Sequence, residues 1–311
     1  MRRIARDPYS YVQDKWKRPK RAGDVHTYWG ALWSKRYTDV YRHHPRLNTE
    51  FGLEAPCTPS TMQIYPEVWE RLKHVLPQLD TIWNYQAELI QFHVEHFRRL
   101  RSTTNAGYIH FWLLDPVPQV GCGVLDSMRL PKGGFEALRL ASQPLHVAMQ
   151  HDGHRAYALW IFNDTPQEYA GTMLRYEVYD EAKQLLLQGS HPIDIAANTA
   201  QQVLPINWRT GHTIKLSITD TDNVTLARNH YTRPFQPARR PTGYPWKFDP
   251  VLGTKVYNRP DAPSLADVST HPALKLIPLF VREWVAEWIM RQRLPLWLVS
   301  WMARVGDRLN R

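Results

Sequence analysis

The chain has 311 residues, of which 43% are hydrophobic and 22% are charged, and its formal net charge is +10. This composition excludes a disordered chain and leaves room for two domains. The only cysteines, Cys57 and Cys122, cannot form a disulfide framework or a cysteine-based zinc site. No stretch reaches the ~20 apolar residues of a membrane-spanning helix, and the basic N-terminus lacks the apolar run of a secretory signal. We therefore expect a cytoplasmic protein.

The positive charge gathers at the two ends of the chain. Eight Lys and Arg residues lie within the first 21 positions, and another set lies in the C-terminal tail. Basic ends bind nucleic acid or anionic lipid in some proteins. No nucleic-acid-binding motif accompanies this charge, so we expect solvated ends and no nucleic-acid partner.

Residues 1–138 have the pattern of an α/β domain. A short helix is expected over 67–76, with Pro66 at its favoured first position. A longer amphipathic helix is expected over 81–101, and a compact strand over 108–114 follows it. Strand, helix and strand form the repeating unit of a parallel barrel. Because a full eight-fold barrel needs about 250 residues, this region can supply only its last two or three units.

Residues 139–235 change to a period of two. Apolar Leu174, Tyr176 and Val178 alternate with polar neighbours, as do the apolar residues of the run 214–218. Turn signals separate these runs. Several short strands at this spacing predict an antiparallel β-sandwich of about 100 residues.

Residues 236–311 form a third region. A connector rich in Pro, Gly and Arg covers 236–263 and is expected to be extended. A helical tail is expected from His271, with an apolar, Trp-containing stripe over 281–289. Docking of this tail on the barrel portion or on a partner is the favoured interpretation. Contact with a membrane surface is the alternative.

One short run resembles a metal-binding cluster. It is His151-Asp152-Gly153-His154. Asp-Gly between two strand-like runs is more often a hairpin turn. We therefore expect a hairpin here, with no metal site and no cofactor.

Two neighbouring motifs carry the clearest functional signal. The stretch 23–33, GDVHTYWGALW, places a histidine and large aromatic residues shortly before the strand-like run 46–52, RLNTEFG. Aromatic rings stack on the apolar faces of sugars, and a carboxylate at a strand end can attack an anomeric carbon. The pair of motifs resembles the nucleophile region of β-mannosidase-like glycoside hydrolases of family 2. In that family a GD-x-H-x-W stretch precedes a SEFG or SEYG strand.

The resemblance continues downstream in the same order, over roughly residues 22–235. The run 111–116, FWLLDP, stands where the family has a strand similar to YWQLND-x-WP. The run 121–126, GCGVLD, with Lys132 after it, is similar to the family stretch SWS-x-x-D-x-x-G-x-x-K. A P-x-x-V motif follows at 144–147, and a strand that ends in Asn-Asp follows at 160–164. Both lie where the sequence pattern changes to that of a β domain.

For the fold, the resemblance implies a multidomain protein, α/β followed by all-β. The C-terminal portion of a (β/α)8 TIM-type barrel would occupy residues 1–138, and an immunoglobulin-like β-sandwich would occupy 139–235. The connector and helical tail at 236–311 have no family counterpart.

For the site, the resemblance implies that Glu50 is the nucleophile of a retaining glycosidase that acts on a β-linked glycoside or oligosaccharide. His26 would contact sugar hydroxyls or orient Glu50. Trp112 would form the floor of the sugar site, with core packing as the alternative. Trp29 and Trp33 fit either role.

The sequence also departs from the family pattern. Leu113 and Pro116 replace polar family residues, and Cys122 replaces the Trp of SWS. The family's acid/base Glu follows an Asn, yet no Asn-Glu pair occurs in the 311 residues, and Glu54 does not match that motif. We therefore expect a chain that is inactive alone or needs a complementary N-terminal chain. The alternative is a non-catalytic carbohydrate-binding or structural protein that kept the scaffold.

Overall fold

The computed structural model describes residues 24–31, 37–42, 44–101, 103–209, 212–231, 246–249 and 254–257. The chain divides into two compact units. The first comprises Met1–Ile90, Ile109–Glu136 and Arg239–Arg311, and the second comprises Gln91–Tyr108 and Ala137–Ala238.

The described elements before the sandwich are short, apart from one long helix. In chain order they are β1 (Asp24–His26), the 3-10 helix η1 (Tyr37–Arg42), β2 (Leu47–Phe51), β3 (Ala55–Pro56), α2 (Pro59–Ile64), α3 (Pro66–Leu72), the 3-10 helix η2 (Lys73–Gln78), α4 (Leu79–Arg99), β4 (Tyr108–His110), β5 (Val120–Gly121) and α5 (Gly134–Ala141).

The first unit is built on a three-stranded sheet in the order β1-β2-β4. Strands β1 and β2 pair in parallel, and His26 lies opposite Glu50. The N–H of Thr27 donates to the carbonyl of Glu50 at 2.7 Å and extends this pairing by one residue. Parallel neighbours are the arrangement of a β/α barrel. The strands of the described residues do not close into one.

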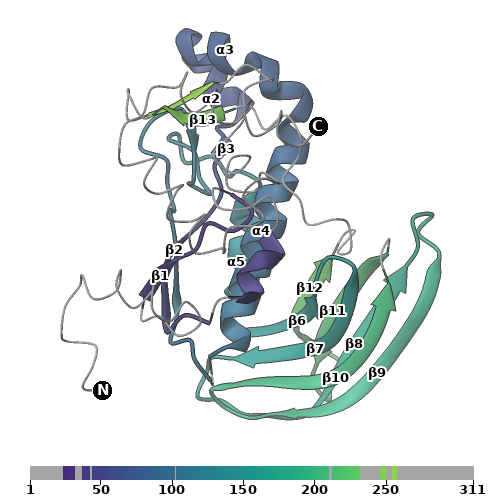
Figure 1. Ribbon diagram of the computed structural model, residues 1–311. Coiled ribbons are helices and arrows are strands. Elements are labelled where there is room, and N and C mark those ends of the chain that lie inside the picture. The colour runs from purple at the N-terminus through teal and green to yellow at the C-terminus, as the bar shows by residue number, and fades with distance from the viewer. Residues whose placement is uncertain are drawn as a thin grey trace, which may run out of the picture. The chain divides into compact units, whose positions relative to one another are not determined.

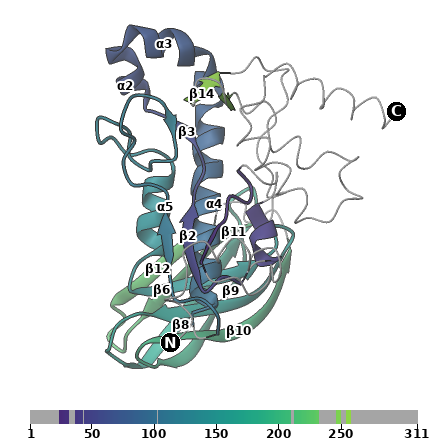
Figure 2. The same cartoon turned by 60° about the vertical axis from the view of Figure 1, so that its left-hand side comes forward.

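Three short helical segments precede α4 and pack against its first turns (Figure 2). Thr58 caps α2 by accepting from the N–H of Thr61, and Pro66 opens α3 as expected. The helix predicted over 67–76 is α-helical only to Leu72, and the chain then continues as the 3-10 helix η2. Pro77 lies inside η2. A proline has no N–H and blocks a regular α-helix, which explains the tighter turn.

The long helix predicted over 81–101 is confirmed as α4, Leu79–Arg99. The strand predicted over 108–114 was too long, because β4 ends at His110. Phe111 still bonds to Phe51 of β2, but the loop from Trp112 onward pairs with itself. The N–H of Leu125 donates to the carbonyl of Leu113 at 2.9 Å, and that of Asp115 donates to Leu125 at 3.0 Å. Leu113 of this loop is 60% exposed.

The second unit holds two antiparallel sheets that face each other (Figure 1). One has the order β10-β7-β6 and the other β12-β11-β8-β9. The predicted β-sandwich is therefore confirmed. Its strands are β6 (Leu145–His151), β7 (Arg155–Asn163), β8 (Tyr169–Tyr179), β9 (Leu185–Ile195), β10 (Thr199–Arg209), β11 (Thr213–Thr219) and β12 (Thr225–Tyr231).

The sandwich core comes from the alternation seen in the sequence. Leu174 and Val178 of β8 and Leu216 of β11 are buried, whereas Arg175 and Lys215 are exposed. Because side chains alternate between the faces of a strand, the apolar set of each strand meets in one core. The hydrophobic effect of that burial holds the two sheets together.

The turn between β6 and β7 is the hairpin predicted from Asp152-Gly153. The carboxylate of Asp152 accepts from the N–H groups of His154 and Arg155, each at 2.8 Å. Gly153 has φ 88°, a conformation that glycine adopts without steric cost.

The end of α4 packs on the sandwich through a buried polar cluster within the second unit. Glu95, 1% exposed, accepts from Tyr231 Oη at 2.8 Å and from Asn229 Nδ2 at 3.0 Å. His146 Nε2 lies 3.2 Å from the same carboxylate. Burial alone would raise the pKa of Glu95, but the hydrogen bond and charge interaction with His146, the charge of Arg99 and the hydrogen bond from Tyr231 together lower that pKa. Glu95 therefore stays ionised in the core.

Shortening a core side chain should weaken the sandwich strongly. Leu216 is 1% exposed, so Leu216→Ala should cost about 2–5 kcal/mol of unfolding free energy through lost burial and a residual cavity. Urea unfolding followed by circular dichroism measures this. Exposed Arg228 on β12 supplies the control, since Arg228→Ala should change stability by about 0.5 kcal/mol at most. Equal losses for the two variants would contradict the assignment of Leu216 to the core.

The third sequence region is described only in part. The predicted helical tail from His271 lies outside the described residues. Within the predicted connector, β13 (Trp246–Asp249) pairs antiparallel with β14 (Thr254–Tyr257). Across the described part of the chain, no helix is long and apolar enough to cross a membrane.

Candidate functional site

The carboxylate of Glu50 is held by two side chains of the preceding motif. His26 Nδ1 lies 2.6 Å from Oε2 of Glu50, and the hydroxyl of Tyr28 donates to the same oxygen at 2.8 Å. The Glu50 side chain is 29% exposed and that of His26 is 40% exposed. The site therefore combines a fixed carboxylate with access from solvent.

Strand pairing creates this contact between residues 24 positions apart in the sequence. The parallel register places His26 opposite Glu50. Next to it, the hydroxyl of Thr27 donates to Oδ1 of Asn48 at 2.8 Å, and neither residue is exposed. A buried hydrogen bond of this kind fixes the register, because slippage would leave both polar groups unpaired.

The glycine of the EFG motif allows β4 to approach the strand that carries Glu50. A Cβ at Gly52 would lie 2.5 Å from the carbonyl oxygen of Phe111. The N–H of Phe111 donates to the carbonyl of Phe51 at 2.8 Å. The Phe111 ring meets Tyr28 edge to face, with ring centroids 6.5 Å apart. The end of β4 is thus packed against the strand that carries Glu50.

Trp112 lies directly after this contact. Its ring is half-buried, its centroid is 4.4 Å from that of Phe111, and the peptide bond between these two residues is cis. Its indole N–H donates to Oδ1 of Asp115 at 3.1 Å. A half-buried indole with its N–H satisfied leaves ring surface available for stacking.

The other two tryptophans of the motif have different outcomes. Trp29 is fully buried, which agrees with the core-packing alternative, because a ring without exposed surface cannot stack on a sugar. Trp33 lies outside the described residues.

Burial shapes the protonation of two groups around the sheet. Burial first, and then the nearby Cys122 and Glu50, raise the pKa of Tyr28 far above its usual range. Tyr28 therefore remains a protonated donor to Glu50. Burial lowers the pKa of His110 on β4 to about 4, so this imidazole is neutral near pH 7.

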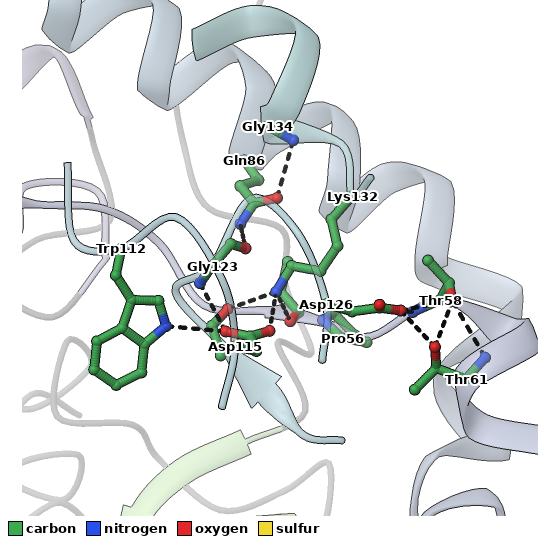
Figure 3. A network of polar contacts seen from close by, with 12 residues as sticks. Pro56, Thr58, Thr61, Gln86, Trp112, Asp115, Gly123, Asp126, Lys132 and Gly134 are labelled. Atoms are coloured by element: carbon green, nitrogen blue, oxygen red, sulfur yellow. Dashed lines mark hydrogen bonds and ion pairs between the residues drawn. The ribbon is translucent and has the colours of Figure 1, made fainter. Parts of the chain in front are cut away.

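Tyr28 was missed as a site residue from the sequence. A signal for it existed, because Tyr28 lies in the same quoted motif, only two positions after His26. Asp115 and Lys132 were also missed, although both lie in the quoted motifs. Figure 3 shows them in one network of polar contacts with Trp112.

The comparisons with known proteins agree with this fold. Residues 155–238 match the family model of the Mannosidase Ig/CBM-like domain. The β-sandwich is therefore similar to mannosidase-type immunoglobulin-like domains. No curated protein sequence matches the chain significantly.

Solved structures extend the similarity beyond the sandwich. A β-D-mannosidase from Dictyoglomus thermophilum has 15% sequence identity and a TM-score of 0.56, over 73% of this chain and 32% of that enzyme. The exo-chitosanase CsxA of Amycolatopsis orientalis, in complex with PNP-β-D-glucosamine, has 13% identity and a TM-score of 0.52, over 65% of this chain and 30% of that one. The family-model match and the shared fold confirm the resemblance to β-mannosidase-like proteins of glycoside hydrolase family 2. The chain spans about a third of the length of these two enzymes.

Proposed function

We propose that this chain carries the nucleophile half of a retaining β-glycosidase site of the β-mannosidase type, with Glu50 as the nucleophile. The observation that supports this most directly is the contact of His26 and Tyr28 with Oε2 of Glu50. Two hydrogen-bonding groups on one oxygen orient a carboxylate, and the exposure of the Glu50 side chain leaves room for a substrate.

The proposed reaction has two steps. An oxygen of Glu50 attacks the anomeric carbon, the bond to the leaving-group oxygen breaks, and a covalent glycosyl-enzyme forms. Water then attacks the same carbon and releases the sugar together with the free carboxylate. A general acid must protonate the leaving group in the first step and take a proton from water in the second.

We propose that this acid/base group comes from a complementary N-terminal chain. A retaining glycosidase needs a second carboxyl group about 5–5.5 Å from the nucleophile, and no Asn-Glu pair of the family type occurs in these residues. Residues 1–138 would then be the closing portion of a barrel, 139–235 the sandwich, and 236–311 a connector and tail that cover the barrel portion. A β-linked glycoside is the proposed substrate class, by analogy with the β-D-mannosidase and the glucosamine complex.

The purified chain should show no turnover of 4-nitrophenyl β-mannoside or β-galactoside. Without acid assistance the leaving group departs unprotonated, which costs about 10²–10⁴-fold in rate. Release of nitrophenolate measures this, with Glu50→Ala as the control for contaminating enzymes. Clear turnover that disappears in Glu50→Ala would show that these residues hold a complete site.

A non-catalytic carbohydrate-binding protein is the second candidate. It is favoured by the loss of polar residues after Trp112, where Leu113 is exposed. In that case β-mannosides would bind to the chain with equal affinity in the wild type and in Glu50→Gln, and no covalent adduct would form. Calorimetric titration of both proteins with methyl β-mannoside distinguishes the two candidates.

A further inference from the structure

The first unit contains a buried charge pair that the proposed chemistry does not use. Lys132 Nζ lies 2.7 Å from Oδ2 of Asp115, and neither side chain is exposed. The same ammonium donates to the carbonyls of Ala55 and Gly121, each at 2.8 Å. A lysine ammonium has three protons, so these three acceptors use its full donor capacity and fix its position.

The second oxygen of Asp115 faces Trp112 (Figure 3). Oδ1 accepts from the indole N–H of Trp112 at 3.1 Å and from the N–H of Gly123 at 2.8 Å. A carboxylate is rigid and planar, so the ammonium on Oδ2 also determines where Oδ1 lies. The charge pair is thereby connected to the indole through one functional group.

The backbone around Cys122 makes room for this carboxylate. A Cβ at Gly123 would lie 2.6 Å from the backbone nitrogen of Asp115, and a Cβ at Gly121 would overlap its carboxyl group. The two glycines that flank Cys122 are therefore required by the position of Asp115.

The indole held by this pair directly follows a residue that bonds to the strand of Glu50. Phe111, the residue before Trp112, bonds to Phe51, the residue after Glu50. The Phe111 ring also contacts Tyr28, which donates to Glu50. A change in the orientation of Trp112 would therefore occur beside the candidate nucleophile.

We infer that Asp115 and Lys132 are positioning residues, which fix the Trp112 indole next to the Glu50 strand as a rigid platform for a pyranose ring. The platform role rests on the proposed function, whereas the positioning can be measured without any sugar. The chain offers a matched comparison in Asp126. This buried carboxylate accepts from the hydroxyls of Thr58 and Thr61 at 2.7 Å each, at the start of α2.

The test is ¹⁹F NMR of the full chain labelled with 5-fluorotryptophan, with the Trp112 resonance assigned by its loss in Trp112→Phe. In Asp115→Asn one oxygen becomes an NH₂ group, which must face either the ammonium or the indole N–H. In Lys132→Met the carboxylate loses its counter-ion. We expect each single variant to shift or broaden the Trp112 resonance.

The double variant Asp115→Asn/Lys132→Met should bring the resonance back toward its wild-type position. There the amide oxygen can again accept from Trp112 while its NH₂ group no longer faces an ammonium. Thr61→Val, which removes one partner of Asp126, should leave the resonance in place.

Folded single variants with an unmoved Trp112 resonance would overturn the inference. A Thr61→Val variant that moves the resonance as far as the Asp115 and Lys132 variants do would also overturn it, because the shift would then reflect a non-specific loss of packing. If Lys132→Met fails to fold, Asp115→Asn and the double variant decide the matter. Since no sugar is present, failure of the Glu50 chemistry would not change these resonances, and the two claims fail separately.

Discussion

Lys132→Met is expected to lower the unfolding free energy of the chain by about 3–5 kcal/mol, because it leaves the buried carboxylate of Asp115 without its counter-ion. The loss exceeds that of an ordinary polar contact, since the carbonyls of Ala55 and Gly121 also lose their donor. Urea unfolding at pH 7 measures the change.

The chain supplies its own control for this experiment. Lys73 forms an ion pair with Glu70 three residues away on the surface, with side chains 47% and 65% exposed. Lys73→Met should cost about 0–1 kcal/mol, because an exposed pair gains little beyond its hydration. A loss below about 1 kcal/mol for Lys132→Met would mean that water reaches Asp115 and that the pair is not buried.

Acid should destabilise the second unit through His151. Burial lowers the pKa of His151 to about 4, compared with about 6.5 for an exposed histidine. Its ring is packed against Phe92, with centroids 4.9 Å apart, and its Nδ1 accepts from the N–H of Gly153 at 3.3 Å. The folded state therefore holds His151 neutral.

The direction of the pH effect follows from that lowered pKa. Above about pH 6.5 His151 is neutral in both the folded and the unfolded state, and its full contribution to the unfolding free energy is present. Between pH 6.5 and about 4 only the unfolded state takes up the proton, so about 3 kcal/mol of stability is lost as the pH falls. Glu95, Arg99 and Asp152 are the charged groups that act on this ring.

His151→Phe isolates this contribution, because it keeps an aromatic ring and removes the titrating group. Unfolding free energies at pH 7, 6, 5 and 4 should fall less steeply for the variant than for the wild type. Parallel pH profiles for the two proteins would show that His151 does not titrate differently on folding.

The sandwich was predictable because its signal is local. Buried Leu174 and Leu216 alternate with exposed Arg175 and Lys215, and a period of two has no competing interpretation over these lengths. The hairpin at Asp152-Gly153 was predictable for a similar reason, since the turn chemistry is contained in two residues.

The loop after β4 was not predictable in the same way. The run 108–114 is apolar enough for a strand, yet only its first three residues enter the sheet. Phe111 still donates to the carbonyl of Phe51, whereas Trp112 and Leu113 pair with residues 124 and 125. Nothing within the run tells whether it pairs with the sheet or with residues 124 and 125. That choice depends on tertiary contacts around Asp115.

The candidate site was predictable as a pair of residues but not as a geometry. The family motif pointed to His26 and Glu50, and the parallel register of β1 and β2 brings them to 2.6 Å. The motif gave no reason to separate Trp29, which is buried, from Trp112, which is half-buried. That distinction depends on the tertiary packing around each ring, and the spacing of aromatic residues alone does not report it.

The central claim, that Glu50 is a glycosidase nucleophile, is tested most directly by covalent trapping. The reagent is 2,4-dinitrophenyl 2-deoxy-2-fluoro-β-D-mannoside, whose leaving group departs without an acid and whose fluorine slows hydrolysis of the adduct. Peptide mass spectrometry should find one fluoromannosyl group on the peptide that contains Glu50. The adduct should be absent in Glu50→Gln and present in Glu54→Gln. An unlabelled but folded wild-type chain, or an adduct that persists in Glu50→Gln, would contradict the claim.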